Sequence, residues 1–191
     1  FLGLSGASSA LDFQSSRTLS LSKAGRGGAQ LTDSITLNPA MLGFQQIQSV
    51  SGTFNWLNQS NTDSSKLFNV AVVDGKNEYV SAGISFTRRQ DVDLIHASLA
   101  KRLAGGISLG TSVKRFSSRN NSASPSADAQ TGFEFGSSLA FAIPTPILET
   151  PIQIGLTADN LIHDAGNERY VGPRQLGIGV KANVSKMLIA Y

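Results

Sequence analysis

Few groups in this 191-residue chain have the types and spacing that chemistry requires. Residues 25–28 (Gly-Arg-Gly-Gly) could cradle a phosphate, but they lack the Lys-Ser/Thr of a P-loop and the spacing of a dinucleotide fingerprint, which favours a tight turn. His96 and His163 stand apart in a chain without Cys, which argues against a metal site. Glu134 and Asp159 could serve as acid and base, yet salt bridges on a polar strand face are the simpler role. A Ser-His-Asp triad stays open at His163, although no G-x-S-x-G elbow supports it.

We therefore predict that the protein is not an enzyme and holds no metal and no cofactor. Nucleic-acid binding is also not expected, because the net charge is only +3 and the two basic pairs, 88–89 and 101–102, do not form a stripe.

The elements that would position these groups are strands of about ten residues, repeated from Phe68 to Tyr191. Within 79–87, for example, apolar residues alternate with Ser, Gly and Thr, so that each strand has one apolar and one polar face. The expected strands are Ile47–Leu57, Leu67–Asp74, Glu78–Arg88, Val92–Arg102, Gly106–Ser117, Thr131–Ile143, Ile152–Leu161, Arg174–Asn183 and Lys186–Tyr191.

The connectors between these strands alternate in length. Long polar connectors at 58–66, 117–130 and 162–173 follow odd-numbered strands, whereas tight turns are expected at 74–77 and 184–185. Bacterial outer-membrane barrels alternate short turns and long loops in this way. Charged residues make up 15% of the chain, below the roughly 25% of soluble domains.

These patterns predict an all-β fold, an antiparallel transmembrane β-barrel in the bacterial outer membrane with the lipid bilayer around it. The competing class is a secreted β-sandwich, which would bury the same apolar side chains in a shared core. The residues that distinguish the two classes are Phe133, Phe135, Leu139, Phe141, Ile154, Leu156, Leu176, Ile178 and Val180.

Three regions are expected along the chain. Residues 1–10 look like the tail of a signal peptide, with Ser8 and Ala10 at the −3 and −1 positions of a cut. Residues 11–44 form an N-terminal plug or lead-in, and 45–191 form the barrel wall. Because about nine strands are visible and such barrels have even strand numbers, we expect the wall to be truncated at its C-terminal end.

Two stretches near the N-terminus carry a family resemblance. Residues 21–29 (Leu-Ser-Lys-Ala-Gly-Arg-Gly-Gly-Ala), an aspartate at 33, and 38–43 (Asn-Pro-Ala-Met-Leu-Gly) resemble the start of the FadL/PorV-like superfamily of outer-membrane barrels. Residues 103–114 and 156–161 resemble later strands of that superfamily. The resemblance implies a barrel of about fourteen strands with the N-terminal segment inside as a plug. The residues of the plug motif are Gly25, Gly27, Gly28, Asp33, Asn38 and Pro39.

The resemblance also implies two functions. Some members resemble a fatty-acid channel, so we expect a channel or transporter for hydrophobic or small solutes. Others resemble PorV, so the alternative is a structural or secretion-associated barrel that docks other outer-membrane or periplasmic proteins.

For the segment itself, we expect Asn38 to cap a short turn, Pro39 and Met41 to anchor it against the first strands, and Gly27 and Gly28 to permit close backbone contact. The polar residues expected to face the lumen are Lys114, Glu134, Gln153, Asp159 and Lys181.

Overall fold

The fold is mostly antiparallel β-structure, as the sequence predicts. The computed structural model describes residues 25–57, 65–89, 92–118, 131–144, 151–163, 174–185 and 188–190. The expected signal-peptide tail at 1–10 and the first part of the lead-in, 11–24, lie outside the described residues. Within the described residues, no helix is long and apolar enough to cross a membrane.

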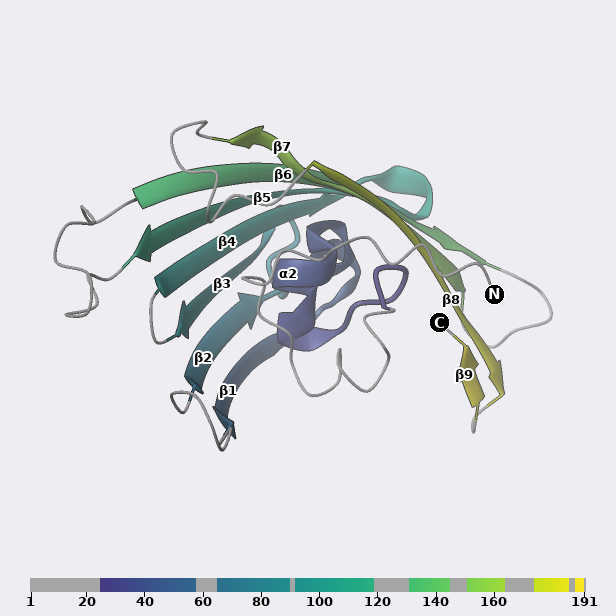
Figure 1. Cartoon of the computed structure of the whole chain (residues 1–191). Coiled ribbons are helices and arrows are strands. Elements are labelled where there is room, and N and C mark those ends of the chain that lie inside the picture. Colours follow the sequence, from purple (N-terminus) through teal and green to yellow (C-terminus); the bar gives the residue numbers. More distant parts are fainter. Residues whose placement is uncertain are drawn as a thin grey trace, which may run out of the picture.

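The strands follow one another across a single curved sheet (Figure 1). Each strand pairs antiparallel with the next along the chain, from β1 to β9. Among the described residues β1 and β9 are the two edges, so the sheet is open rather than closed. The strands are β1 Gln48–Leu57, β2 Ser65–Asp74, β3 Ser81–Arg88, β4 Val92–Arg102, β5 Ile107–Ser118, β6 Thr131–Ile143, β7 Ile152–His163, β8 Gln175–Ser185 and β9 Leu188–Ala190.

The predicted tight turn at 74–77 is wrong, because the connector between β2 and β3 runs on to residue 80. The side-chain oxygen of Asn77 accepts hydrogen bonds from the backbone nitrogens of Tyr79 (2.9 Å) and Val80 (3.4 Å). These bonds hold two residues that the alternation had assigned to the strand, so that β3 begins only at Ser81.

Two other strand ends also differ from the prediction. The turn expected at 184–185 lies within β8, whose Ser185 pairs with Leu188 of β9. His163, expected in a loop, is the last residue of β7 and lies opposite Glu134 of β6. The longer β7 contains an irregularity in its pairing with β6, which alternation along one strand cannot show.

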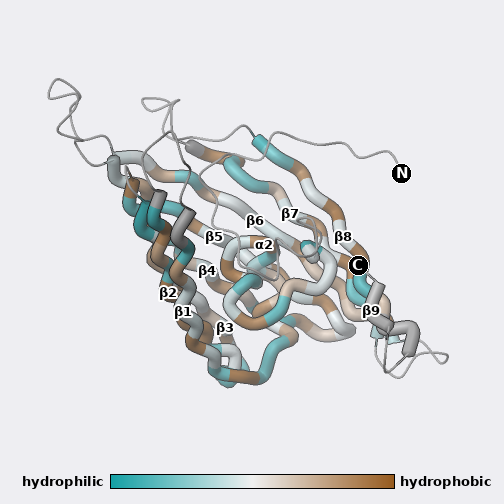
Figure 2. Tube along the Cα trace, turned by 60° about the horizontal axis from the view of Figure 1, so that its bottom comes forward, coloured by the Kyte–Doolittle hydropathy of each residue, from teal (hydrophilic) through white to brown (hydrophobic). Residues whose placement is uncertain are grey.

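The two faces of the sheet have opposite chemical character, and Figure 2 shows hydrophobic and hydrophilic residues alternating along strands such as β8. The concave face buries mostly small and polar residues, whereas the other face, here the outer face, exposes large hydrophobic ones. Of the nine residues that distinguish barrel from sandwich, six are exposed and three (Leu139, Phe141 and Ile154) are partly exposed. The described strands therefore form one sheet with an apolar outer surface, not two sheets around a shared core.

Residues 25–44, here the inner segment, lie in the concavity of the sheet (Figure 1). They contain the short helices η1 Leu31–Asp33, α2 Ser34–Leu37 and η2 Pro39–Phe44, while a further turn, η3 Ala104–Gly106, joins β4 to β5. The sequence predicts a short turn over 38–42, where η2 forms, but not the helical run at 31–37, which is too short to show a helical period.

The apolar core lies between the inner segment and the concave face. Ile35 and Leu42 are fully buried and cluster with Ala71, Val73 and Ala100 of β2 and β4. Ala40 and Met41 pack in a second cluster with Ala140 of β6. Most of the contacts of η2 are with β4 and β5. The expectation that Pro39 and Met41 anchor the segment against the first strands is therefore wrong, and the reason is the space provided at Gly110 of β5, described below.

Candidate functional site

Asn38 organises the inner segment from its centre. Its side chain is fully buried, and its oxygen accepts a hydrogen bond from the backbone nitrogen of Ala40 (3.2 Å). Its amide nitrogen donates to the carbonyl oxygen of Arg26 (2.7 Å). Pro39 occupies the first position of η2. The cap that the sequence predicts is present, and Asn38 also joins η2 to the turn at 25–28.

Glycines let the start of the inner segment touch the wall. Gly25 has a φ of 127°, a conformation that favours glycine, and the carbonyl of Gly25 accepts a bond from the nitrogen of Gly28 (3.0 Å). A Cβ on Gly27 would lie 2.3 Å from the carbonyl carbon of Gly179, and one on Gly28 would meet the side chain of Lys181. Both expected close contacts are therefore made, and the strand that receives them is β8.

Arg26 makes the principal polar contact between this turn and β7. Its Nη1 lies 3.1 Å from Oδ2 of Asp159 and donates a hydrogen bond to Oγ1 of Thr157. The register between β6 and β7 shifts next to Asp159, and the following residue, Asn160, has a φ of 58°. Bulges of this kind re-aim side chains, so the irregularity helps to present the carboxylate to Arg26.

Sequence reasoning did not single out Arg26. The available signal was a cation between glycines, together with a carboxylate, Asp159, on the polar face of a strand more than a hundred residues away. The sequence suggests that polar groups of the segment could pair with Asp159, but only the fold shows that Arg26 is the residue that does so.

A row of buried polar and charged side chains crosses three strands on the concave face of the sheet. His96 of β4 lies opposite Lys114 of β5, which lies opposite Glu134 of β6. Nζ of Lys114 is 3.7 Å from Oε2 of Glu134, and both side chains are 7% exposed. The two carboxylates that could have formed an acid–base pair each contact a cation instead, Glu134 with Lys114 and Asp159 with Arg26.

The remaining predicted site residues also lie around the inner segment. Gln153 of β7 and Lys181 of β8 are register partners, and Lys181 is buried beneath Gly28. Asp33 is buried just before α2, and its carbonyl accepts a bond from Oγ1 of Thr36 (3.2 Å). In the part of the chain that the structure describes, no three His, Asp or Glu residues gather as a metal site.

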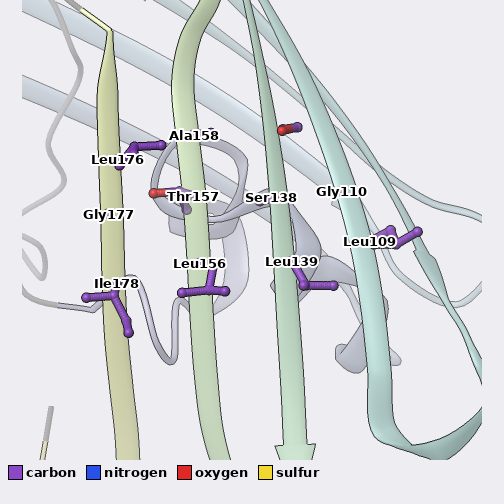
Figure 3. A pocket seen from close by; sticks show the side chains of 11 residues that line it. Leu109, Gly110, Ser138, Leu139, Leu156, Thr157, Ala158, Leu176, Gly177 and Ile178 are labelled. Atoms are coloured by element: carbon purple, nitrogen blue, oxygen red, sulfur yellow. The ribbon is translucent and has the colours of Figure 1, made fainter.

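A groove of about 660 Å³ lies on the opposite, outer face of β5 to β8 (Figure 3). Leu109, Leu139, Leu156 and Ile178 are successive register partners along it. Ser137 and Ala158 also line it, and they leave room between the larger side chains. The groove has no charged residue in its lining.

Comparison with known proteins adds no identification. No protein-family model matches the chain, and no curated protein or solved structure matches it. The resemblance to the FadL/PorV-like superfamily therefore remains an expectation based on its motifs.

Replacing Asn38 by Ala should loosen the inner segment without unfolding the sheet. The change removes a cap worth about 1 kcal/mol and leaves the partly buried carbonyl of Arg26 without this donor, at a further cost of about 1 kcal/mol. Limited proteolysis within residues 25–44 should become several-fold faster. Asn77→Ala is the matched control, because Asn77 bonds two backbone nitrogens in an exposed connector instead. Equal cleavage of the segment in both variants would contradict this role of Asn38.

Proposed function

We propose that the described strands form part of the wall of a transmembrane β-barrel in the bacterial outer membrane, with the inner segment as its plug. The distribution of side chains carries the proposal: large hydrophobic residues are exposed on the outer face, while Ser, Thr, Lys and Glu are buried on the concave face. A water-soluble domain rarely exposes so extensive an apolar surface, whereas lipid would cover it. Strands β1 to β8 have 8 to 13 residues, close to the 9–11 that a tilted strand needs to cross a bilayer.

Charged side chains lie at both ends of the apolar stretch on the outer face of β4, which supports the placement of this surface in a bilayer. Arg88 and Asp93 form an exposed ion pair at 3.3 Å where β3 meets β4. Lys101, which is exposed, lies near the other end of β4. The residues between them that face outward are Ile95, Ala97 and Leu99, and their chemistry suits lipid chains.

The function we propose is a channel or transporter for hydrophobic or small solutes, gated by the plug. A barrel wider than about eight strands has a lumen that its own side chains do not fill. In this protein the inner segment occupies the concave side, so its displacement would open a path lined by the polar face. The proposed cargo is no more specific than this class, because the polar lining suits small solutes and the family resemblance suggests hydrophobic ones.

One observation favours the alternative, a structural or secretion-associated barrel that docks partner proteins. Ile35, Asn38 and Leu42 are fully buried, so the inner segment is packed tightly against the wall. A plug that never leaves would seal the lumen, and the outer-membrane or periplasmic partners would then bind elsewhere on the protein.

Solute uptake into liposomes distinguishes the two functions. If the protein is a gated channel, deleting residues 11–44 should raise the uptake of small solutes well above that of the intact protein. The heat-modifiable gel shift of a folded barrel serves as the folding control. A folded deletion variant that admits no more solute than the intact protein would contradict the channel, and co-purification with partner barrels would then support the alternative.

A further inference from the structure

We propose that the outer face of β5 to β8 binds one lipid molecule whose anionic headgroup carries a phosphate. Arg115 of β5 contacts the phosphate, and the groove on β5 to β8 takes an acyl chain. This inference rests on the proposed placement of the outer face in a bilayer, and it adds the class of lipid that this face selects.

Arg115 places a positive charge among apolar residues of the outer face. Its side chain is exposed, and its register partners on the neighbouring strands are Ile95 and Phe133. The guanidinium carbon lies 6.0 Å from the centre of the Phe133 ring. Within the described residues Arg115 forms no ion pair, whereas Arg88 is paired with Asp93 at 3.3 Å. An anion from the bilayer would therefore supply the counter-charge that the described part of the chain does not.

The polar and apolar parts of the outer face meet at the level of Arg115. One step toward the nearer ends of β5 and β6, Ser117 and Thr131 are register partners and carry hydroxyl groups. One step the other way, Val113 and Phe135 are exposed and hydrophobic. Each two-residue step along a tilted strand spans about 5 Å of the bilayer thickness, so Arg115 lies close to the headgroup region. A guanidinium group suits a phosphate there, because its planar donors match the phosphate oxygens bidentately.

The groove lies deeper on the same face (Figure 3). Ser137, which lines it, is four residues along β6 from Phe133, a distance of about 13 Å. One leaflet of the hydrocarbon core is about 15 Å thick, so an acyl chain that descends from a headgroup at Arg115 reaches the groove. The lining is uncharged, and the small side chains of Ser137 and Ala158 leave space for the chain. The volume of about 660 Å³ is within the range of small-molecule sites.

Quenching of single tryptophans by brominated lipids tests the selectivity for an anionic headgroup. In a Trp56→Phe background, Phe135→Trp reports beside Arg115, and Ile84→Trp reports at the same register level on β3. In phosphatidylcholine vesicles, brominated phosphatidylglycerol should bind at position 135 about 5-fold tighter than brominated phosphatidylcholine, since one interfacial arginine attracts the anionic headgroup. Position 84 should show a difference of less than about 2-fold, because salt screens the charge over that distance. Arg115→Gln should abolish the difference at position 135, whereas Lys101→Gln, which removes another exposed cation, should leave it unchanged.

Filling the groove tests the contact with the acyl chain. Native mass spectrometry of protein purified in mild detergent from vesicles that contain phosphatidylglycerol should detect one retained lipid per chain. Ala158→Phe should reduce this retention several-fold, whereas Ala97→Phe, on the outer face of β4 outside the groove, should leave it unchanged.

Three results would overturn the proposal: equal quenching by the two lipids at position 135, loss of their difference when inorganic phosphate is added at constant ionic strength, or full lipid retention in Ala158→Phe. Loss of the difference with inorganic phosphate would assign the site to free phosphate instead of a lipid. Absence of quenching by either lipid at both positions 84 and 135 would contradict the bilayer placement itself, and with it this proposal.

Discussion

A valine in place of Gly110 should expel η2 from the concave face while leaving the sheet paired. A Cβ at this position would lie 2.3 Å from the backbone nitrogen of Ala40 and 2.7 Å from the carbonyl carbon of Pro39, and backbone atoms cannot rotate away. Displacement would expose Met41 and Leu42, whose burial contributes about 1.5–3 kcal/mol each. Valine itself suits a strand better than glycine, so the wall should tolerate the change. Limited proteolysis of residues 25–44 would measure the release.

Gly52 provides the matched control for this experiment. It is also a glycine within a strand, but a Cβ there would meet nothing within 4 Å. Gly52→Val should therefore leave the proteolysis pattern unchanged. Protection of the inner segment in Gly110→Val to the same degree as in Gly52→Val would show that η2 does not rest against β5.

Replacing Glu134 by Gln should be one of the most destabilising single changes in the wall. It removes the negative partner of Lys114, whose side chain is 7% exposed. Removing one partner of a buried ion pair costs about 3–5 kcal/mol, whereas removing both charges together is close to neutral. The double variant Lys114→Met/Glu134→Leu should therefore recover most of the stability that Glu134→Gln loses. Denaturant unfolding of the protein in lipid would report the free energies.

The exposed ion pair Arg88–Asp93 provides the control for this experiment. Its side chains are 55% and 25% exposed, so Asp93→Asn should cost less than about 1 kcal/mol. If Glu134→Gln lowered the free energy of unfolding no more than Asp93→Asn does, the buried pair Lys114–Glu134 would contribute no more to stability than an exposed ion pair.

Alternation along the chain predicts most of the sheet because each strand carries its own signal. The predicted bounds of β4 and β6 match the structure, although Thr131–Ile143 alternates clearly and Val92–Arg102 alternates less well. The strand after β2 was predicted to begin too early, because Tyr79 and Val80 continue the alternation while Asn77 holds their backbone in a turn. The hydrogen bonds to Asn77 therefore delay the start of β3 beyond the residue that the alternation predicts.

The candidate site was less predictable, because its contacts join distant parts of the chain. The cap at Asn38 could be read from the Asn-Pro pair, whose effect is local. The contact between Arg26 and Asp159 depends on the irregular pairing of β7, and the docking of η2 depends on a glycine in β5. Neither contact can be predicted from the periodicity of residues within a single helix or strand.

Tryptophan fluorescence in vesicles with brominated acyl chains would show whether the outer face contacts lipid. Trp56→Phe removes the only native tryptophan, after which a tryptophan can be placed at Ile178, which is 71% exposed on the outer face. The matched position is Phe116, which is 2% exposed on the concave face. We expect strong quenching of Ile178→Trp and little quenching of Phe116→Trp in the folded protein. Equal quenching at both positions, or none at position 178, would contradict this expectation.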